Sequence, residues 1–393
     1  MARYRILTLD GGGAWALIEA MTLIDLYGAD TTGHEVLSDF DMVAANSGGS
    51  IVLGGLVENL TLQQMLDFFL SQSKRESVFV KKGLHLPGLE KYITADKLTG
   101  LQAAFEKRRD VPLNEVALDI PGHSSGKPVH LLIAGFNYDR SRGEFFRSAD
   151  ATRKGWGDGA SSTATLAECI HASSNAPIRY FDRPAEFPTQ PGKHYWDGAI
   201  SGSNNPILIA VTEALVLGQL PKNLAALSLG TGGTFLPFAP ENADPDEPFY
   251  QVMHPSSFTT DLEKIAGAIL DDPPDVASFM AHVMSGGPPA DLDPPVDSSI
   301  VRMNPMIAPV MSAEGEFVLP HGMDDDSFET LVKLDLDAVE QEQVDEIVNF
   351  ARLWLKGSVS NQPVRMASDL TPEIGQAKYA QAKAAWLQLT GEN

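Results

Sequence analysis

The chain has 393 residues, of which 43% are hydrophobic, and its net charge is −23. This length suits one large α/β domain or two ordinary domains, with enough apolar residues for a sizeable core. The negative charge argues against nucleic-acid binding, which needs a basic surface, and against adhesion to anionic lipid surfaces. The single cysteine, Cys169, excludes an intrachain disulfide, and its apolar helical surroundings predict a buried structural thiol.

No targeting or membrane-spanning segment is evident in the sequence. The N-terminal residues M-A-R-Y-R-I-L-T-L contain two arginines but no apolar core of signal-peptide length. A run of about 18 apolar residues, as a spanning helix requires, does not occur. We therefore expect a cytoplasmic protein, with peripheral membrane contact and export without a signal peptide as the alternatives.

The first predicted element is a β-strand over 4–9 that leads directly into Asp10-Gly11-Gly12-Gly13, and a helical pattern follows. In this setting backbone N–H groups are free to bind an anion. A nucleotide P-loop is excluded because no Lys-Ser/Thr pair follows, and the spacing does not fit a dinucleotide fingerprint. Three successive glycines cost more backbone entropy than a plain turn requires, so these residues favour an oxyanion hole.

The second strand ends at Ala45 and is followed by Asn46, Ser47, Gly48 and Gly49. A strand, a serine in a sharp turn and a glycine-lined first helical turn are typical of a nucleophile elbow. Small residues are needed there because the strand and the helix nearly touch. Since Ala45 replaces the usual first glycine, the stretch by itself fits an ordinary strand-to-helix turn equally well.

The middle of the chain alternates between capped helices and apolar strands, which predicts a mostly parallel sheet covered on both faces. Asp139 to Gly143 fits a hairpin turn, and Asp197-Gly198-Ala199 forms a small-residue turn after an aromatic pair. The other predicted elements are helices over 61–71 and 95–107, a helix that begins at 165 and ends before 175, and strands over 129–136, 144–147 and 224–229.

After Phe235 the sequence becomes acidic and rich in proline, notably over 240–248, 271–274 and 288–297. The apolar stripe over 276–284 predicts a helix packed on the core, with a lid or lipid-contacting flap as the alternative. A strand over 301–305, an amphipathic helix over 338–355 and an alanine-rich helix to about 389 follow. We expect a main domain over 1–356 with an acidic insertion at 235–300, and a helical extension over 357–393.

A serine nucleophile needs a base and oxyanion donors, and two arrangements of these groups fit the chain. In a Ser-His-Asp triad, His194 or His254 would serve Ser47, although His194 precedes Asp197 by only three positions. In a Ser-Asp dyad, Asp197 accepts the serine proton directly, and the amides of Gly11 to Gly13 hold the oxyanion.

These pieces, in this order, resemble the patatin-like phospholipase family. Asp10-Gly11-Gly12-Gly13 is similar to the oxyanion loop of the family, A-N-S-G-G over 45–49 to its nucleophile elbow, and Asp197-Gly198-Ala199 to its aspartate motif. The resemblance runs from residue 4 to about 233 and faintly on to 355. Supporting similarity lies at 173–177, 204–206, 228–232 and, more weakly, 301–305.

The resemblance implies a three-layer α/β/α fold, a Ser47–Asp197 dyad, an oxyanion hole of Gly11, Gly12 and Gly13, and no metal or other cofactor. It also implies hydrolysis of lipid or lysolipid esters through an acyl-enzyme, as phospholipases A and lysophospholipases do, with transient contact at a membrane surface. An acyltransferase and a non-catalytic lipid- or protein-binding relative are the alternatives. The oligomeric state is not indicated.

The sequence departs from the family pattern at two positions. Ala45 replaces the first glycine of the elbow, where its methyl group narrows the approach of strand and helix. Trp15 stands two residues after the third glycine, where the family usually has an arginine. The loss of that positive charge disfavours phosphate head groups and favours a neutral ester substrate.

Overall fold

The structure of the chain is a computed structural model. It describes residues 3–82, 90–124, 126–148, 164–178, 180–239, 247–252, 255–257, 264, 274–288 and 298–391. Most of the predicted acidic, proline-rich segments lie outside the described residues, and so does His254.

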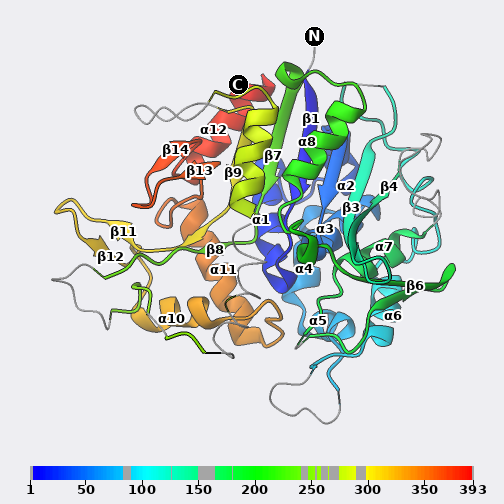
Figure 1. The fold of residues 1–393 in the computed structure, drawn as a ribbon, viewed down its shortest axis with the longest axis horizontal. Coiled ribbons are helices and arrows are strands. Elements are labelled where there is room, and N and C mark those ends of the chain that lie inside the picture. The colour runs from blue at the N-terminus through cyan, green and yellow to red at the C-terminus, as the bar shows by residue number, and fades with distance from the viewer. Residues whose placement is uncertain are drawn as a thin grey trace.

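A mostly parallel sheet of eight strands forms the central layer of the molecule (Figure 1). Its strands are β1 (Tyr4–Leu9), β2 (Met42–Ala45), β3 (His130–Asn137), β4 (Arg142–Arg147), β5 (Ala185–Phe187), β6 (Gln190–Asp197), β7 (Leu224–Leu229) and β9 (Ile300–Met303). Their order is β5-β6-β3-β2-β1-β7-β9, and β4 also pairs with β3. The strands from β3 to β9 along this order are parallel, whereas β4, β5 and β6 form an antiparallel region at one edge.

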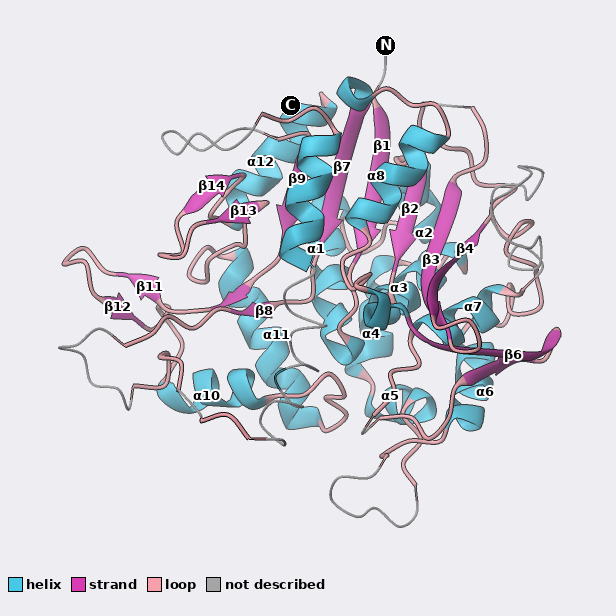
Figure 2. Ribbon diagram, viewed as in Figure 1, coloured by secondary structure: helices cyan, strands magenta, loops and turns pink. Residues whose placement is uncertain are grey.

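Helices cover both faces of this sheet, as Figure 2 shows. The labelled helices are α1 (Leu17–Tyr27), α2 (Gly33–Ser38), α3 (Ser47–Val57), α4 (Leu62–Leu70), α5 (Gln72–Val78), α6 (Thr94–Ala104), α7 (Leu166–Ser173), α8 (Ile207–Val216), α10 (Asp325–Lys333), α11 (Gln341–Leu355) and α12 (Tyr379–Thr390). Residues 274–284 form a further helix. Short 3-10 turns are η1 (Gly13–Ala16), η3 (Gly198–Ser201) and η4 (Pro221–Asn223), and short strand pairs are formed by β8 (Gly233–Thr234) with β10 (Met306–Ile307), β11 (Val310–Met311) with β12 (Phe317–Val318), and β13 (Arg365–Met366) with β14 (Pro372–Ile374).

Two hydrophobic clusters hold the layers together, one on each face of the sheet. On β1, Leu7 belongs to the larger cluster and Ile6 to the smaller one, because alternate side chains of a strand point to opposite faces. Both side chains are completely buried. A sheet buried on both faces explains why its strands appear in the sequence as continuous apolar runs. The predicted α/β/α architecture with a mostly parallel sheet is therefore confirmed.

The helix over 274–284 contacts the sheet through only one of its sides. Ala277 and Ala281 are buried in the smaller cluster, whereas Val276, Met280 and Val283 are exposed. The helix is thus packed on the core, as predicted from its apolar stripe. It also presents a second apolar side to solvent.

The C-terminal helix α12 packs on the main core. Trp386 stacks on Phe40 with ring centroids 5.9 Å apart, and the Tyr379 hydroxyl donates to Asp25 at 2.6 Å. These contacts join residues beyond 357 to α1 and to the segment that follows α2, while the domain boundary at 356 stays a prediction.

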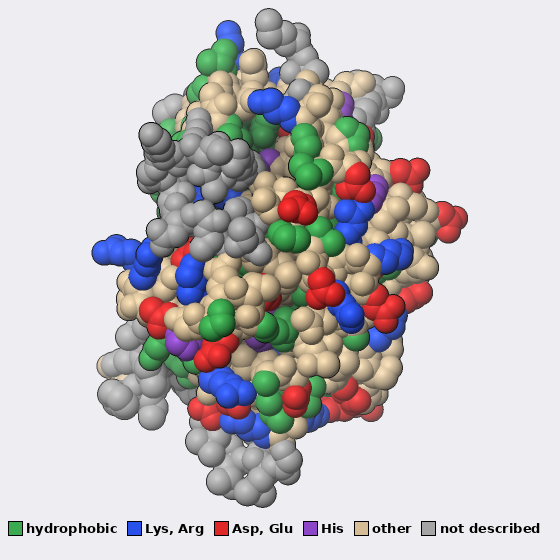
Figure 3. Space-filling model, turned by 90° about the vertical axis from the view of Figure 1, so that its right-hand side faces the viewer, with side chains coloured by type: hydrophobic (Ala, Val, Ile, Leu, Met, Phe, Trp, Pro, Cys, Tyr) green, Lys and Arg blue, Asp and Glu red, His purple; other side chains and the backbone are tan. Residues whose placement is uncertain are grey.

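Charged and hydrophobic side chains are interspersed over the face drawn in Figure 3. Among the described residues, no helix is both long enough and apolar enough to cross a bilayer. The cytoplasmic location stays a prediction.

Candidate active site

Ser47 occupies the turn between β2 and α3, where the backbone is strained. Its φ is 47°, in the left-handed region that a residue with a side chain rarely adopts. A Cβ on Gly48 would lie 2.5 Å from the Gly13 carbonyl oxygen, and one on Gly49 would lie 2.5 Å from that of Leu9. Both positions therefore require glycine, because α3 begins in direct contact with the β1 end and the glycine loop.

Helix α7 supports the turn from the other side. The Ser47 N–H donates to the Ser173 hydroxyl at 2.9 Å, and the Ser50 hydroxyl donates to the Ser47 carbonyl at 2.5 Å. Ser173 is completely buried at the end of α7. The sequence marked residues 173–177 only as a supporting similarity, and the structure places the first of them in direct contact with the Ser47 backbone.

Asp197 lies beside Ser47 at the end of β6. Its Oδ1 accepts the Asn46 side-chain amide at 3.1 Å and the Ala199 N–H at 2.9 Å. Burial is the largest influence and raises the Asp197 pKa, while a hydrogen bond with the Ser47 side chain lowers it in part. Asn46, which the sequence analysis did not assign, thus orients the carboxylate.

The glycine loop crosses in front of the elbow. The Gly11 N–H donates to the Asn204 carbonyl at 2.8 Å, and the Thr231 hydroxyl donates to the Gly11 carbonyl at 2.7 Å. Among the described residues, no comparable contact occupies the N–H of Gly12 or Gly13. Of the three predicted oxyanion donors, these two therefore have N–H groups that remain available.

A buried ion pair fixes the start of the loop. The Arg302 guanidinium contacts the Asp10 carboxylate at 2.5 Å and donates to the Ser228 hydroxyl at 2.9 Å. Burial raises the pKa of Asp10 to about 6, although Arg302 acts against this shift. The Asp10 N–H donates to the Glu19 carboxyl at 2.6 Å. The weak similarity over 301–305 therefore contains a residue that anchors the glycine loop.

Residues 335–337, which we call the strap, lie across the loop between α10 and α11. The Ala14 N–H donates to the Leu336 carbonyl at 3.0 Å, and the Trp15 indole N–H donates to the Asp335 carbonyl at 3.2 Å. The Trp15 ring is buried and meets Phe350 edge-on at 6.2 Å. Trp15 therefore joins the strap to the core instead of supplying a charge.

The two carboxylates of the strap are held by residues from distant parts of the chain. The Tyr92 hydroxyl donates to Asp337 at 2.5 Å, and the Tyr180 hydroxyl donates to Asp335. Lys91 contacts Asp337 at 2.9 Å and Asp335 at 3.2 Å. We call these contacts the clasp, because they close the strap over Ser47.

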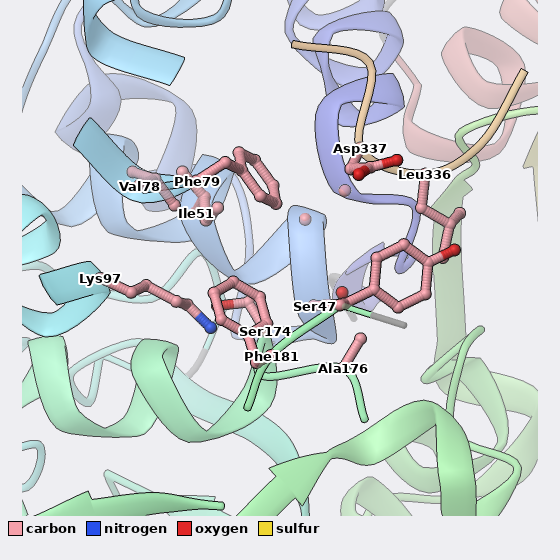
Figure 4. Close-up of a pocket in the computed structure, with 13 residues that line it drawn as sticks. Ser47, Ile51, Val78, Phe79, Lys97, Ser174, Ala176, Phe181, Leu336 and Asp337 are labelled. Carbon is pink, nitrogen blue, oxygen red and sulfur yellow. The ribbon is translucent and has the colours of Figure 1, made fainter. Parts of the chain in front are cut away.

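The remaining space beside Ser47 is a cavity of about 20 Å³, close to the room that one water molecule occupies. Figure 4 shows Ser47, Lys97 and the strap residues around it. Ser47 itself is only 8% exposed. A lipid acyl chain does not fit in this closed state. The lining residues are Gly13, Ser47, Gly48, Ile51, Val78, Phe79, Lys97, Ser174, Ala176, Tyr180, Phe181, Leu336 and Asp337.

His194, one of the two histidines considered for a triad, contacts two other carboxylates. Its Nδ1 lies 2.9 Å from Asp139 and its Nε2 lies 3.1 Å from Glu186, so both ring nitrogens are engaged away from Ser47. No cluster of side chains suited to a metal ion occurs among the described residues.

Comparison with known proteins agrees with the family suggested by the motifs. The model of the family described as patatin-like phospholipase matches residues 7–211, just over half of the chain, and the chain belongs to this family.

One relative is a cGAMP-activated phospholipase of Pseudomonas aeruginosa, which is 27% identical over 147 residues. That match covers 37% of this chain and 40% of the relative. Among solved structures, VipD from Legionella pneumophila has 10% identity and a TM-score of 0.33, with 89% of this chain and 67% of VipD covered. The type III effector protein ExoU has 12% identity and a TM-score of 0.24, with 71% and 53% covered.

Proposed function

We propose that the chain hydrolyses acyl esters of lipids or lysolipids, with Ser47 as nucleophile and Asp197 as general base. The observation that carries the proposal is the strained Ser47, whose neighbour Asn46 donates a hydrogen bond at 3.1 Å to the buried carboxylate of Asp197. A serine held in this way is a recognisable nucleophile when a base and oxyanion donors converge on it. Membership of the patatin-like phospholipase family supports a lipid substrate.

In the proposed reaction, Ser47 Oγ attacks the ester carbonyl carbon while its proton passes to Asp197. The negative oxygen of the tetrahedral intermediate accepts hydrogen bonds from Gly12 and Gly13, with Gly11 holding the loop. Asp197 then gives the proton to the leaving alcohol, which leaves an acyl-enzyme. A water molecule, deprotonated by Asp197, attacks this ester, and the fatty acid departs as Ser47 recovers its proton.

The direct test is to incubate the purified chain with a lysophospholipid and to measure the free fatty acid released. A parallel reaction with an added acceptor alcohol separates hydrolysis from acyl transfer, since a transferase would yield a new ester. Absence of both products, together with no labelling by a fluorophosphonate in the unsubstituted chain, would favour the non-catalytic alternative.

Ester hydrolysis is expected to lose kcat/KM as the pH falls through the Asp197 pKa, because only the carboxylate accepts the Ser47 proton. Burial raises this pKa above the usual 3.8, so the acid limb should lie above that value. Because the Asp197 pKa is higher in the folded chain than in the unfolded chain, protonated Asp197 stabilises the fold at low pH. That contribution to the free energy of unfolding is lost as the pH rises through the folded-state pKa.

A pH–rate profile for a soluble ester measures the acid limb. Asn46→Ala removes one hydrogen bond that lowers the Asp197 pKa, so it should move the limb to higher pH. A limb that moves to lower pH would contradict the assignment of Asp197 as the base.

Weakening the clasp is expected to expose Ser47. Asp337→Asn removes the charge that binds Lys91 and Tyr92, so it should raise the rate of fluorophosphonate labelling about threefold to tenfold by populating an open strap. The labelling rate is followed by intact mass.

Glu340→Gln is the matched control for this clasp variant. This substitution breaks the ion pair between Glu340 and Lys81, which lies outside the strap. The Lys81 side chain is 58% exposed and that of Glu340 is 56% exposed. Equal labelling rates for Asp337→Asn and Glu340→Gln would show that the clasp does not limit access.

A further inference from the structure

A basic side chain that the proposed dyad does not use reaches the active-site cavity. Lys97 comes from α6, is 0% exposed, and lines the same cavity as Ser47 (Figure 4). It is the only lysine or arginine among the described residues that line this cavity.

The contacts of Lys97 leave donor capacity unused. Its ammonium donates to the His171 carbonyl at 3.1 Å and lies 4.4 Å from the centre of the Phe181 ring. No carboxylate forms an ion pair with it among the described residues. An ammonium group has three N–H donors, and among the described residues only the His171 carbonyl accepts a hydrogen bond from this one.

A buried ammonium without an ion pair is costly, and lysines in such places lose their proton easily. Burial accordingly lowers the Lys97 pKa well below its ordinary value, with Asp197 acting in the opposite sense. His171, the other titratable group in contact, has its own pKa lowered well below normal by burial and by Lys97. An anion that enters the cavity would therefore stabilise the protonated form of Lys97.

Asp197 is the one carboxylate that acts on the Lys97 pKa, and no ion pair joins the two among the described residues. The cavity wall contributed by α3 and α5 is apolar, with Ile51, Val78 and the adjoining Phe79. The Asp337 carboxylate of the strap is already bound by Lys91 and Tyr92. Lys97 thus lies on the wall of the cavity with one hydrogen-bond acceptor, the His171 carbonyl.

We propose that Lys97 binds an anionic oxygen group, a phosphate or a carboxylate, on the lipid that enters the active site. This inference rests on the proposed function for the lipid nature of the ligand. The family usually has an arginine at the position of Trp15. Here a basic side chain reaches the site from α6 instead of from the glycine loop. The preferred substrate class is therefore an anionic lysolipid.

The test measures binding, so that it does not depend on turnover. The Ser47→Ala chain is titrated by calorimetry with a lysophosphatidic acid and with the monoacylglycerol of the same short acyl chain, both kept monomeric. The phosphate lipid should bind about tenfold tighter or more, as expected for charge-assisted hydrogen bonds. Adding Lys97→Met should reduce this preference to about twofold or less.

Lys81→Met in the Ser47→Ala chain is the matched control, because Lys81 is exposed and does not line the cavity. It should keep the full preference. A second pair, the fatty acid and its fatty alcohol, identifies the anion. If only the fatty acid binds tighter than its neutral counterpart, Lys97 binds the product carboxylate. If the lysophosphatidic acid binds tighter than the monoacylglycerol, Lys97 binds the head-group phosphate.

A preference that survives Lys97→Met, or no preference in either pair for the Ser47→Ala chain, would overturn the proposal. Should Lys97→Met fail to fold, titrations of the Ser47→Ala chain in buffers of different ionisation enthalpy decide the matter. Binding of the anionic lipid should take up a proton, and binding of the neutral lipid should not. Failure of the hydrolase proposal is read separately, from fatty acid release and fluorophosphonate labelling of the unsubstituted chain.

Discussion

Replacing Ser47 with alanine is expected to lower the rate of lipid ester hydrolysis by about a thousandfold or more and to abolish fluorophosphonate labelling. The proposed reaction has no other nucleophile, and water alone lacks the orientation that the elbow gives to the serine. Asp197→Asn should cause a loss of similar size, because an amide cannot accept the serine proton.

Two further variants sharpen this prediction. Ser47→Gly should also abolish activity, yet it should raise the free energy of unfolding by about 1 kcal/mol, because glycine adopts the φ of 47° without strain. His194→Ala should stay within about twofold of the unsubstituted rate, since its ring is occupied by Asp139 and Glu186. Activity lost in His194→Ala but retained in Asp197→Asn would contradict the dyad.

Replacing Arg302 with methionine is expected to lower the free energy of unfolding by about 3–5 kcal/mol, because it leaves the Asp10 carboxylate buried without its partner. The side chains of the pair are only 2% and 4% exposed. The glycine loop should lose its anchor at the same time, so hydrolysis should fall in the folded fraction. Urea denaturation followed by circular dichroism measures the change.

Lys333→Met provides the comparison for Arg302. It breaks an ion pair with Glu329 whose side chains are 71% and 51% exposed, so it should cost about 1 kcal/mol at most. If Arg302→Met were no more destabilising than this variant, the buried pair could not be what holds the glycine loop.

The sequence predicted the elements whose signals are local. The glycine loop, the turn at Ser47 and the aspartate turn each lie within a few consecutive residues, and the structure brings all three together. The hairpin turn at 139–143 joins antiparallel β3 and β4 as predicted. The helix predicted over 95–107 spans Thr94–Ala104, and the one predicted over 338–355 spans Gln341–Leu355, because helix ends depend on contacts that the apolar pattern does not contain.

The supporting residues of the site could not be assigned because their partners lie far away in sequence. Asn46 contacts Asp197 across 151 positions, and Trp15 contacts the strap across 320. The family resemblance over 301–305 includes Arg302, but only the three-dimensional structure shows that Arg302 forms an ion pair with Asp10. Lys97 lies in a helix of ordinary polar and apolar pattern, so its burial beside the nucleophile has no signal in the sequence.

The buried thiol of Cys169 can be used to measure local opening of the structure around it. Cys169 is 0% exposed on α7, the helix that also carries Ser173, and burial raises its pKa well above the ordinary value. An alkylating reagent therefore reacts only when α7 leaves its place, so the alkylation rate records how often the scaffold behind the elbow opens. Because no other cysteine competes, spectroscopic labels can be introduced anywhere on the surface without first removing a native one.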